Sequence, residues 1–263
     1  MLKERAITTM VGVPILLLFL FLGKTFFFLL VTVIIILGLL EFSCLFKGFE
    51  VKIDTFLLLL AGIIFCVTVY LYGIKGLRPA FLILLFITVI KMIFSGGRFS
   101  IKSIALTVFG SMYIGLSLSH LILIREINVF GSLFVLAVFL GTWIFDISAY
   151  TLGLMFGKRK LAPKISPNKT WEGTIGGFII TTILVGCFWF ISPLTFFERA
   201  LLGAVIAIFC QVGDLFESKI KREVGVKDSG AILPGHGGIL DRFDSLIFSA
   251  PGAFYFIKML LLK

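Results

Sequence analysis

Acidic residues at the ends of apolar stretches are the part of this sequence best suited to chemistry. Asp214 and Glu217 close one apolar stretch in QVGDLFESK, and Asp241 and Asp244 open the next in LDRFD. Each pair has i,i+3 spacing, which places both carboxylates on one face of a helix. Such like charges repel unless a cation lies between them, and oxygen-only ligands favour a hard ion. The spacing therefore predicts a Mg²⁺ site.

A fifth acid, Asp146, lies well inside the apolar stretch GTWIFDISAY. Placing a carboxylate in a membrane helix costs about 2.5–3.5 kcal/mol, so it normally faces a partner or a water-filled cavity. Asp146 could complete a second cation position, or act as a proton or ion relay. The other acids have an alternative too, as helix-end ion pairs with the neighbouring bases Lys219, Lys221, Arg222 and Arg242.

The loop 218–244 follows the first acidic pair and ends with the second, and the part between the pairs is rich in glycine and resembles an anion-binding turn in composition. Its glycines would let backbone N–H groups approach a phosphate closely. His236 could donate a hydrogen bond to that phosphate or act as acid or base, or it could simply stabilise the loop. Other candidate ligands in the loop are Lys227, Asp228, Gly237 and Gly238.

A second polar loop, 157–172, reads GKRKLAPKISPNKTWE and comes just before an apolar stretch. Hydroxyl groups, ammonium groups and the free N–H groups of a helix start together favour an anion. The candidate residues are Ser166, Pro167, Asn168, Lys169 and Thr170. The bases at 158–160 are better explained by membrane orientation. Small residues at Gly153, Gly157, Gly173 and Gly177 predict close helix packing.

The elements that must position these groups are membrane helices. The 263-residue chain is 59% hydrophobic and only 14% charged, which predicts an all-α, polytopic integral membrane protein. We expect about nine transmembrane helices, with eight as the alternative, and a polar site at the cytoplasmic edge. The apolar stretches are 7–22, 25–43, 55–74, 79–94, 104–124, 129–152, 173–192, 198–217 and 245–262.

Most of the 24 Lys and Arg residues fall in alternate loops, which predicts a cytoplasmic N-terminus and places both polar loops in the cytoplasm. Polar residues concentrate in the second half. We therefore divide the chain into an N-terminal scaffold, 1–128, and a catalytic transmembrane domain, 129–263. The net charge of +10 is better explained by lipid headgroups or phosphate ligands than by nucleic acid. The four cysteines lack metal-site spacing, and packing explains them best.

The segment from Ser218 to Asp244 resembles the signature of the phosphatidate cytidylyltransferase family without interruption. It reads SKIKREVGVKDSGAILPGHGGILDRFD. The stretches SPNKTWEG at 166–173 and QVGDLFE at 211–217 are similar to further motifs of that family. The resemblance covers most of residues 141–244, whereas the first half resembles the family only in hydropathy.

This resemblance implies synthesis of CDP-diacylglycerol from CTP and phosphatidate, with release of pyrophosphate, by a Mg²⁺-dependent enzyme that is often a dimer. We expect it in a bacterial inner membrane with its active site facing the cytoplasm. By hypothesis Asp214, Asp241 and Asp244 hold Mg²⁺, with Asp146 at a second cation. Groups expected to bind or act on the substrates are Lys219, Lys221, Lys227, Asp228, His236, Arg222 and Arg242, with 166–170 assisting.

Two alternative functions share some of these features. A related cytidylyltransferase or kinase acting on another lipid or a polyprenol would need the same acids and bases. A transporter would also place acids among many helices, but paired broken helices in two halves are typical of transporters and are not visible in this sequence. The gathering of polar residues in two loops favours an enzyme.

Overall fold

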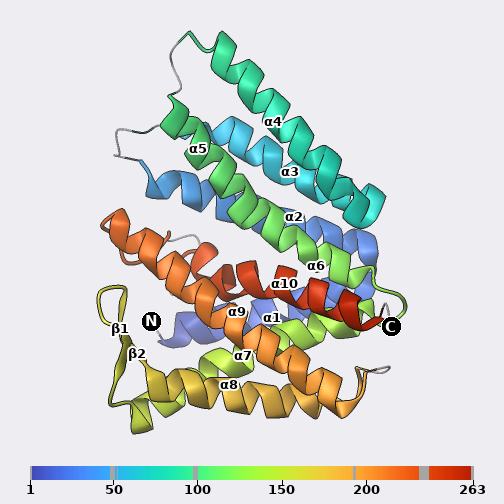
Figure 1. Cartoon of the computed structure of the whole chain (residues 1–263), viewed down its shortest axis with the longest axis vertical. Coiled ribbons are helices and arrows are strands. Elements are labelled where there is room, and N and C mark those ends of the chain that lie inside the picture. The colour runs from blue at the N-terminus through green and yellow to red at the C-terminus, as the bar shows by residue number, and fades with distance from the viewer. Residues whose placement is uncertain are drawn as a thin grey trace. The chain divides into compact units, whose positions relative to one another are not determined.

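The computed structural model of the protein describes residues 2–47, 51, 53–96, 100–191, 194–230 and 237–261. Helices dominate these residues, which confirms the prediction of an all-α polytopic membrane protein (Figure 1). In order they are α1 (Leu2–Leu22), α2 (Lys24–Leu45), α3 (Thr55–Tyr72), α4 (Leu77–Phe94), α5 (Ile101–Gly110), α6 (Ser117–Arg125), α7 (Gly131–Phe156), α8 (Trp171–Gly186), α9 (Phe196–Glu223) and α10 (Leu240–Leu261).

The predicted apolar stretches all lie largely within these helices. The stretch 104–124 runs through α5, a π-helical turn at Ser111–Leu116, and α6. In the described part of the chain, six helical stretches are long and apolar enough to cross a membrane, and α1 and α8 hold shorter apolar stretches. One of the six, Thr55–Phe94, is 40 residues long and contains both α3 and α4. The predicted number of nine spans is therefore not confirmed.

The chain forms two compact units. The first comprises residues 1–126 and 224–242, and the second comprises residues 127–223 and 243–263. The first boundary lies beside the predicted one at residue 128. Residues 224–242, which we predicted to be part of the catalytic domain, pack with the N-terminal helices instead.

The first unit has a tightly packed apolar core. Phe27, Phe42 and Phe65 are almost completely buried. A Cβ atom added to Gly110 would lie 2.5 Å from the ring of Phe42, so glycine allows the helices to approach there. Asp54 caps the start of α3 by accepting the Leu57 N–H at 3.0 Å, and its carboxylate forms an ion pair with Lys91. An apolar core thus also contains acids whose charge is compensated.

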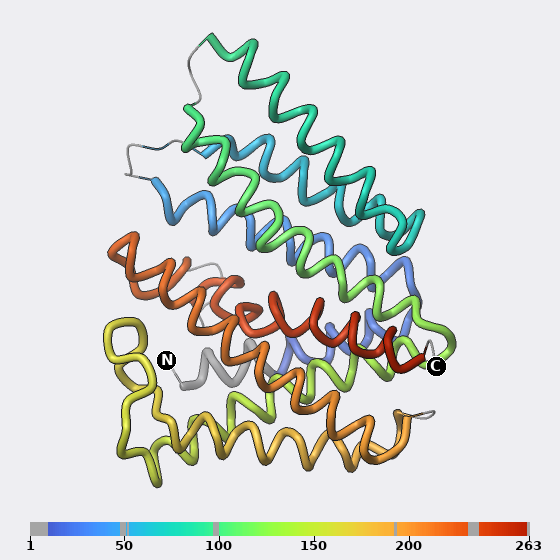
Figure 2. Tube along the Cα trace, in the orientation of Figure 1, coloured from blue at the N-terminus to red at the C-terminus, as the bar shows by residue number. Residues whose placement is uncertain are grey.

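The second unit is built on α7, α8 and α9, which pack against one another (Figure 2). As the small residues predicted, α7 and α8 approach closely: a Cβ atom on Gly173 would lie 2.9 Å from the Cα atom of Gly153. Between α7 and α8 the chain forms a short antiparallel hairpin of β1 (Lys160–Ala162) and β2 (Ser166–Thr170). The polar loop 157–172 is therefore mostly an ordered hairpin.

Candidate active site

Four carboxylates gather in the second unit. Asp244 on α10 experiences the negative charges of Asp214 and Glu217 on α9 and of Asp146 on α7. Asp146 in turn experiences the charge of Asp214, and its side chain is hydrogen-bonded to Ser245. The intramembrane acid Asp146 is therefore close enough to Asp214 and Asp244 for their charges to interact, whereas Asp241, the other predicted Mg²⁺ ligand, has different contacts.

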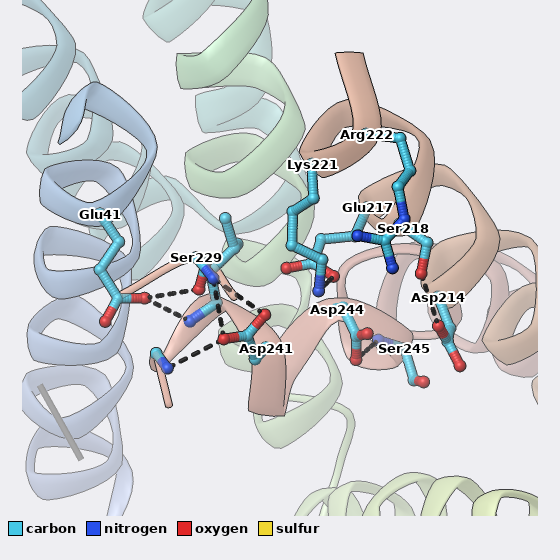
Figure 3. Close-up of polar contacts among 12 residues, drawn as sticks. Glu41, Asp214, Glu217, Ser218, Lys221, Arg222, Ser229, Asp241, Asp244 and Ser245 are labelled. Atoms are coloured by element: carbon cyan, nitrogen blue, oxygen red, sulfur yellow. Dashed lines mark hydrogen bonds and ion pairs between the residues drawn. The ribbon is translucent and has the colours of Figure 1, made fainter. Parts of the chain in front are cut away.

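Two lysines compensate part of this negative charge. Lys169 on β2 forms an ion pair with Asp214, and Lys221 forms one with Glu217 one turn earlier on α9. Ser218 also donates a hydrogen bond to Asp214, at 3.3 Å (Figure 3). Glu217 is 1% exposed, whereas Asp214 is 31% exposed. Asp214 is therefore the member of the two pairs that a substrate or cation could reach most easily.

The hairpin that carries Lys169 is fixed at both of its ends. Thr170 caps α8 by accepting the Gly173 N–H at 3.2 Å, and Arg222 donates to the carbonyl of Ile165 at 3.3 Å. Glu172 accepts the Lys158 N–H at 3.0 Å. Hydrogen bonds from the backbone N–H groups of Glu172 itself and of Lys158 lower the pKa of the Glu172 carboxyl. These contacts set the position of Lys169 relative to α9.

A different arrangement surrounds Asp241 in the first unit. Its carboxylate accepts the N–H groups of Ser229 and Gly238, at 3.0 and 2.9 Å. Beside it lies Glu41 of α2, a buried acid that also binds this segment (Figure 3). Sequence reasoning missed Glu41 because it treated α2 as scaffold, although an acid inside an apolar stretch was the signal used for Asp146.

The remaining predicted residues of the polar loop occupy more open positions. Lys227, Asp228 and Arg242 are exposed, as is Lys219, which pairs with Glu223 at 2.9 Å. Asp228 also lines a pocket of about 380 Å³ whose wall includes Lys47 and Ser229. His236 lies outside the described residues. Gly237 has a φ of +81°, a conformation that favours glycine.

Of the helix-end ion pairs that we considered as an alternative, Lys221–Glu217 forms, whereas Lys219 pairs with Glu223, which is not one of the acids in question. The carboxylates of Asp146, Asp214 and Asp244 nevertheless offer only oxygen donors and repel one another, which fits the chemistry of a hard divalent cation. The described residues contain no ready-made cluster of three metal-ligating side chains. Any ion would therefore draw these acids closer together and rely on substrate oxygens as well.

The sequence profile of the cytidylyltransferase family matches residues 3–260. This protein therefore belongs to the cytidylyltransferase family, whose members are nucleotidyltransferases, and the resemblance inferred from its motifs is confirmed.

Individual relatives agree with this family assignment. The phosphatidate cytidylyltransferase of Bacillus subtilis is 37% identical over 190 residues, which cover 71% of this chain and 70% of the relative. The phosphatidate cytidylyltransferases of Staphylococcus haemolyticus and Staphylococcus aureus are 44% and 42% identical over 168 residues. Those two matches cover 63% of this chain and 64% of each relative, slightly less than two thirds.

Proposed function

We propose that this protein is a CTP:phosphatidate cytidylyltransferase that makes CDP-diacylglycerol and pyrophosphate for phospholipid synthesis. The observation that carries the proposal is the cluster of Asp146, Asp214 and Asp244 with Lys169, in a chain whose relatives are named for this reaction. A membrane-embedded group of acids next to a basic hairpin suits the meeting of a lipid phosphate with a soluble nucleotide.

The reaction needs no covalent intermediate on the protein. A phosphate oxygen of phosphatidate attacks the α-phosphorus of CTP and forms a new P–O–P bond, while the bond from the α-phosphorus to the bridging oxygen of the β-phosphate breaks. Pyrophosphate leaves with the electrons of that bond. Because the attacking phosphate is already an anion, the protein acts chiefly by positioning the substrates and compensating their charge.

Lysine and arginine side chains would supply much of that compensation. Lys169 is held beside Asp214 and could exchange this partner for a nucleotide phosphate when CTP binds. The exposed bases Lys219, Arg222, Lys227 and Arg242 have long, flexible side chains that could reach phosphate oxygens, and Lys219 and Arg222 would exchange Glu223 and the Ile165 carbonyl for them. Ser166, Asn168 and Thr170 would assist from the hairpin.

Mg²⁺ stays a prediction, with Asp214 and Asp244 among the residues that would hold it and Asp146 at a second cation. When bound, it would neutralise charge that develops on the phosphates. Asp241 remains a predicted ligand as well, because carboxylate oxygens that accept N–H groups keep further lone pairs. A second cation and a homodimer also remain predictions, as does a cytoplasmic active site in a bacterial inner membrane.

The test is to incubate the detergent-purified protein with phosphatidate, radiolabelled CTP and Mg²⁺, and to follow label in the lipid fraction together with pyrophosphate. Parallel reactions replace CTP with ATP, add EDTA, or replace phosphatidate with a polyprenyl phosphate or diacylglycerol. We expect lipid labelling only with CTP, phosphatidate and the metal. Labelling of a different acceptor would overturn the substrate assignment and leave the family assignment intact.

A further inference from the structure

Glu41 is a buried acid in the first unit that no step of the proposed reaction uses. It lies in the last turns of α2, is 3% exposed, and has the buried residues Leu39 and Phe42 within two positions of it in sequence. An acid in such surroundings is costly unless hydrogen bonds compensate its charge. The partners of Glu41 therefore indicate what it does.

Those partners are backbone and hydroxyl donors of the glycine-rich segment. Glu41 accepts the Ile239 N–H at 2.9 Å on one carboxylate oxygen and the Leu240 N–H at 2.8 Å on the other. The Ser229 hydroxyl lies 3.2 Å from the second oxygen. Leu240 begins α10, so these N–H groups belong to the start of a helix, where backbone donors lack partners within the helix and negative charge is favourable. Glu41 of α2 thus acts as the cap of α10, because Ile239, the residue just before this helix, has no polar side chain that could do so.

Asp241 holds the same segment through further hydrogen bonds, and we call Glu41, Ser229 and Asp241 together the clamp. Ser229 donates its N–H to Asp241 and is hydrogen-bonded through its hydroxyl to Glu41. The two carboxylates therefore hold residues 229–230 against residues 237–241, on either side of a part of the loop that lies outside the described residues. Charge-assisted hydrogen bonds of this kind are roughly twice as strong as neutral ones.

The two glycines nearest to Glu41 are explained by the space that its side chain occupies. A Cβ atom added to Gly230 would lie 2.8 Å from one carboxylate oxygen, and one added to Gly238 would lie 2.5 Å from the other. The Gly238 Cβ atom would also collide with the Ser229 hydroxyl. Our prediction that the glycines of this segment let backbone N–H groups approach a phosphate stays a prediction; what the structure adds is that Gly230 and Gly238 make room for Glu41.

From these contacts we infer that Glu41 is a positioning residue for the nucleotidyl transfer, because it fixes residues 229–230 and 237–241 and the first turn of α10. Asp241 lies in that turn and Asp244 lies one turn further along the same helix. The inference rests on the proposed function, since it assigns Glu41 to that reaction. It extends the site to a residue of the N-terminal half, which we predicted to be scaffold only.

The test compares Glu41→Gln and Glu41→Asp with Asp54→Asn. Asp54 is the matched control, because it is a buried acid of the same unit that caps α3 and forms an ion pair with Lys91 of α4. A glutamine would point an amide N–H at one of the two backbone N–H groups. We expect Glu41→Gln to lower kcat about tenfold to hundredfold, since a buried donor loses a charged acceptor, while both KM values change little. Glu41→Asp keeps the charge and should restore part of kcat.

A second measurement does not depend on activity. Amide hydrogen exchange of Ile239 and Leu240 should be about tenfold faster in Glu41→Gln than in the wild type, and unchanged in Asp54→Asn, because only the first loses their acceptor. If wild-type protein fails to label phosphatidate, the substrate assignment fails, whereas the exchange difference still tests the clamp.

Two results would overturn the inference. One is unchanged exchange at Ile239 and Leu240 in Glu41→Gln. The other is a loss of kcat that matches the one seen in Asp54→Asn at an equal loss of thermal stability. If Glu41→Gln does not fold, Ser229→Ala removes one contact of the same clamp and should still lower kcat about tenfold, as expected for one hydrogen bond to a charged group. An unchanged kcat in that variant would count against the clamp.

Discussion

Two groups of acids, Asp214 with Glu217 in the second unit and Glu41 with Asp241 in the first, are compensated in different ways. In the second unit Asp214 and Glu217 pair with the side chains of Lys169 and Lys221. In the first unit Glu41 and Asp241 accept hydrogen bonds mainly from backbone N–H groups. A lysine side chain can leave its carboxylate when a phosphate or cation arrives, but a backbone N–H cannot. The side-chain ion pairs of the second unit therefore suit exchange with substrates, and the backbone hydrogen bonds of the first unit suit rigidity.

The largest effect is expected from Asp214→Asn. Removing the charge that faces Lys169 should lower kcat by about a hundredfold to a thousandfold, the range found when one preorganised electrostatic group is removed from an active site. Steady-state rates of CDP-diacylglycerol formation measure it. Glu223→Gln on the same helix is the control and should keep normal activity. Near-normal turnover by Asp214→Asn would remove this residue from the site.

A smaller effect is expected from Lys169→Met, which keeps most of the side-chain volume. The loss of a charged hydrogen-bond donor to phosphate should lower kcat/KM for CTP about tenfold to hundredfold. Lys160→Met, in the other strand of the hairpin, provides the comparison and should change kcat/KM little. Equal effects of the two substitutions would mean that the hairpin contributes only general positive charge.

The rigid arrangement of the first unit can be tested through stability. Gly238→Ala places a methyl group against Glu41 and Ser229, and should lower the free energy of unfolding by about 1–3 kcal/mol, as overpacking does elsewhere. Thermal unfolding followed by fluorescence measures it. Gly12→Ala is the control, because a Cβ atom there meets nothing within 4 Å. If both variants unfold at the same temperature, the space around Glu41 is less restricted than described.

The smallest effect concerns the hairpin and depends on pH. Because the pKa of Glu172 is lower in the folded protein, its contribution to hairpin stability is complete at neutral pH and disappears as the pH falls through that pKa. The fluorescence of the neighbouring Trp171 should therefore change at a pH below the usual pKa range of a glutamate. Glu172→Gln should abolish this change. A transition that persists in the variant would have to come from another group.

The sequence was sufficient to predict the helices, the family and the acids of the second unit. Apolar length reports membrane helices directly, and the cost of a buried charge singles out Asp146. The positions of Lys169 and Glu41 could not be obtained in this way. Lys169 reaches Asp214 only because the loop forms a hairpin whose second strand precedes α8, and its strands of three and five residues are too short to show a pattern.

Glu41 was harder to recognise, because its hydrogen-bond partners lie 188 to 199 residues further along the chain. No local spacing connects an acid in α2 with a helix start near the C-terminus. Asp241, in contrast, accepts a hydrogen bond from Gly238, only three residues away, and its place in the family motif at 218–244 allowed it to be predicted from the sequence.

The long interval between Glu41 and its partners also has a consequence for biosynthesis. At about 5–20 residues per second, a ribosome needs about 10–40 s to add the residues between Glu41 and Leu240. During that time α2 enters the membrane or lies at its surface, and its carboxylate cannot yet accept hydrogen bonds from the N–H groups of Ile239 and Leu240. Completion of the first unit is therefore postponed until most of the second has been synthesised, and a chain interrupted before residue 239 leaves Glu41 without these two hydrogen-bond donors.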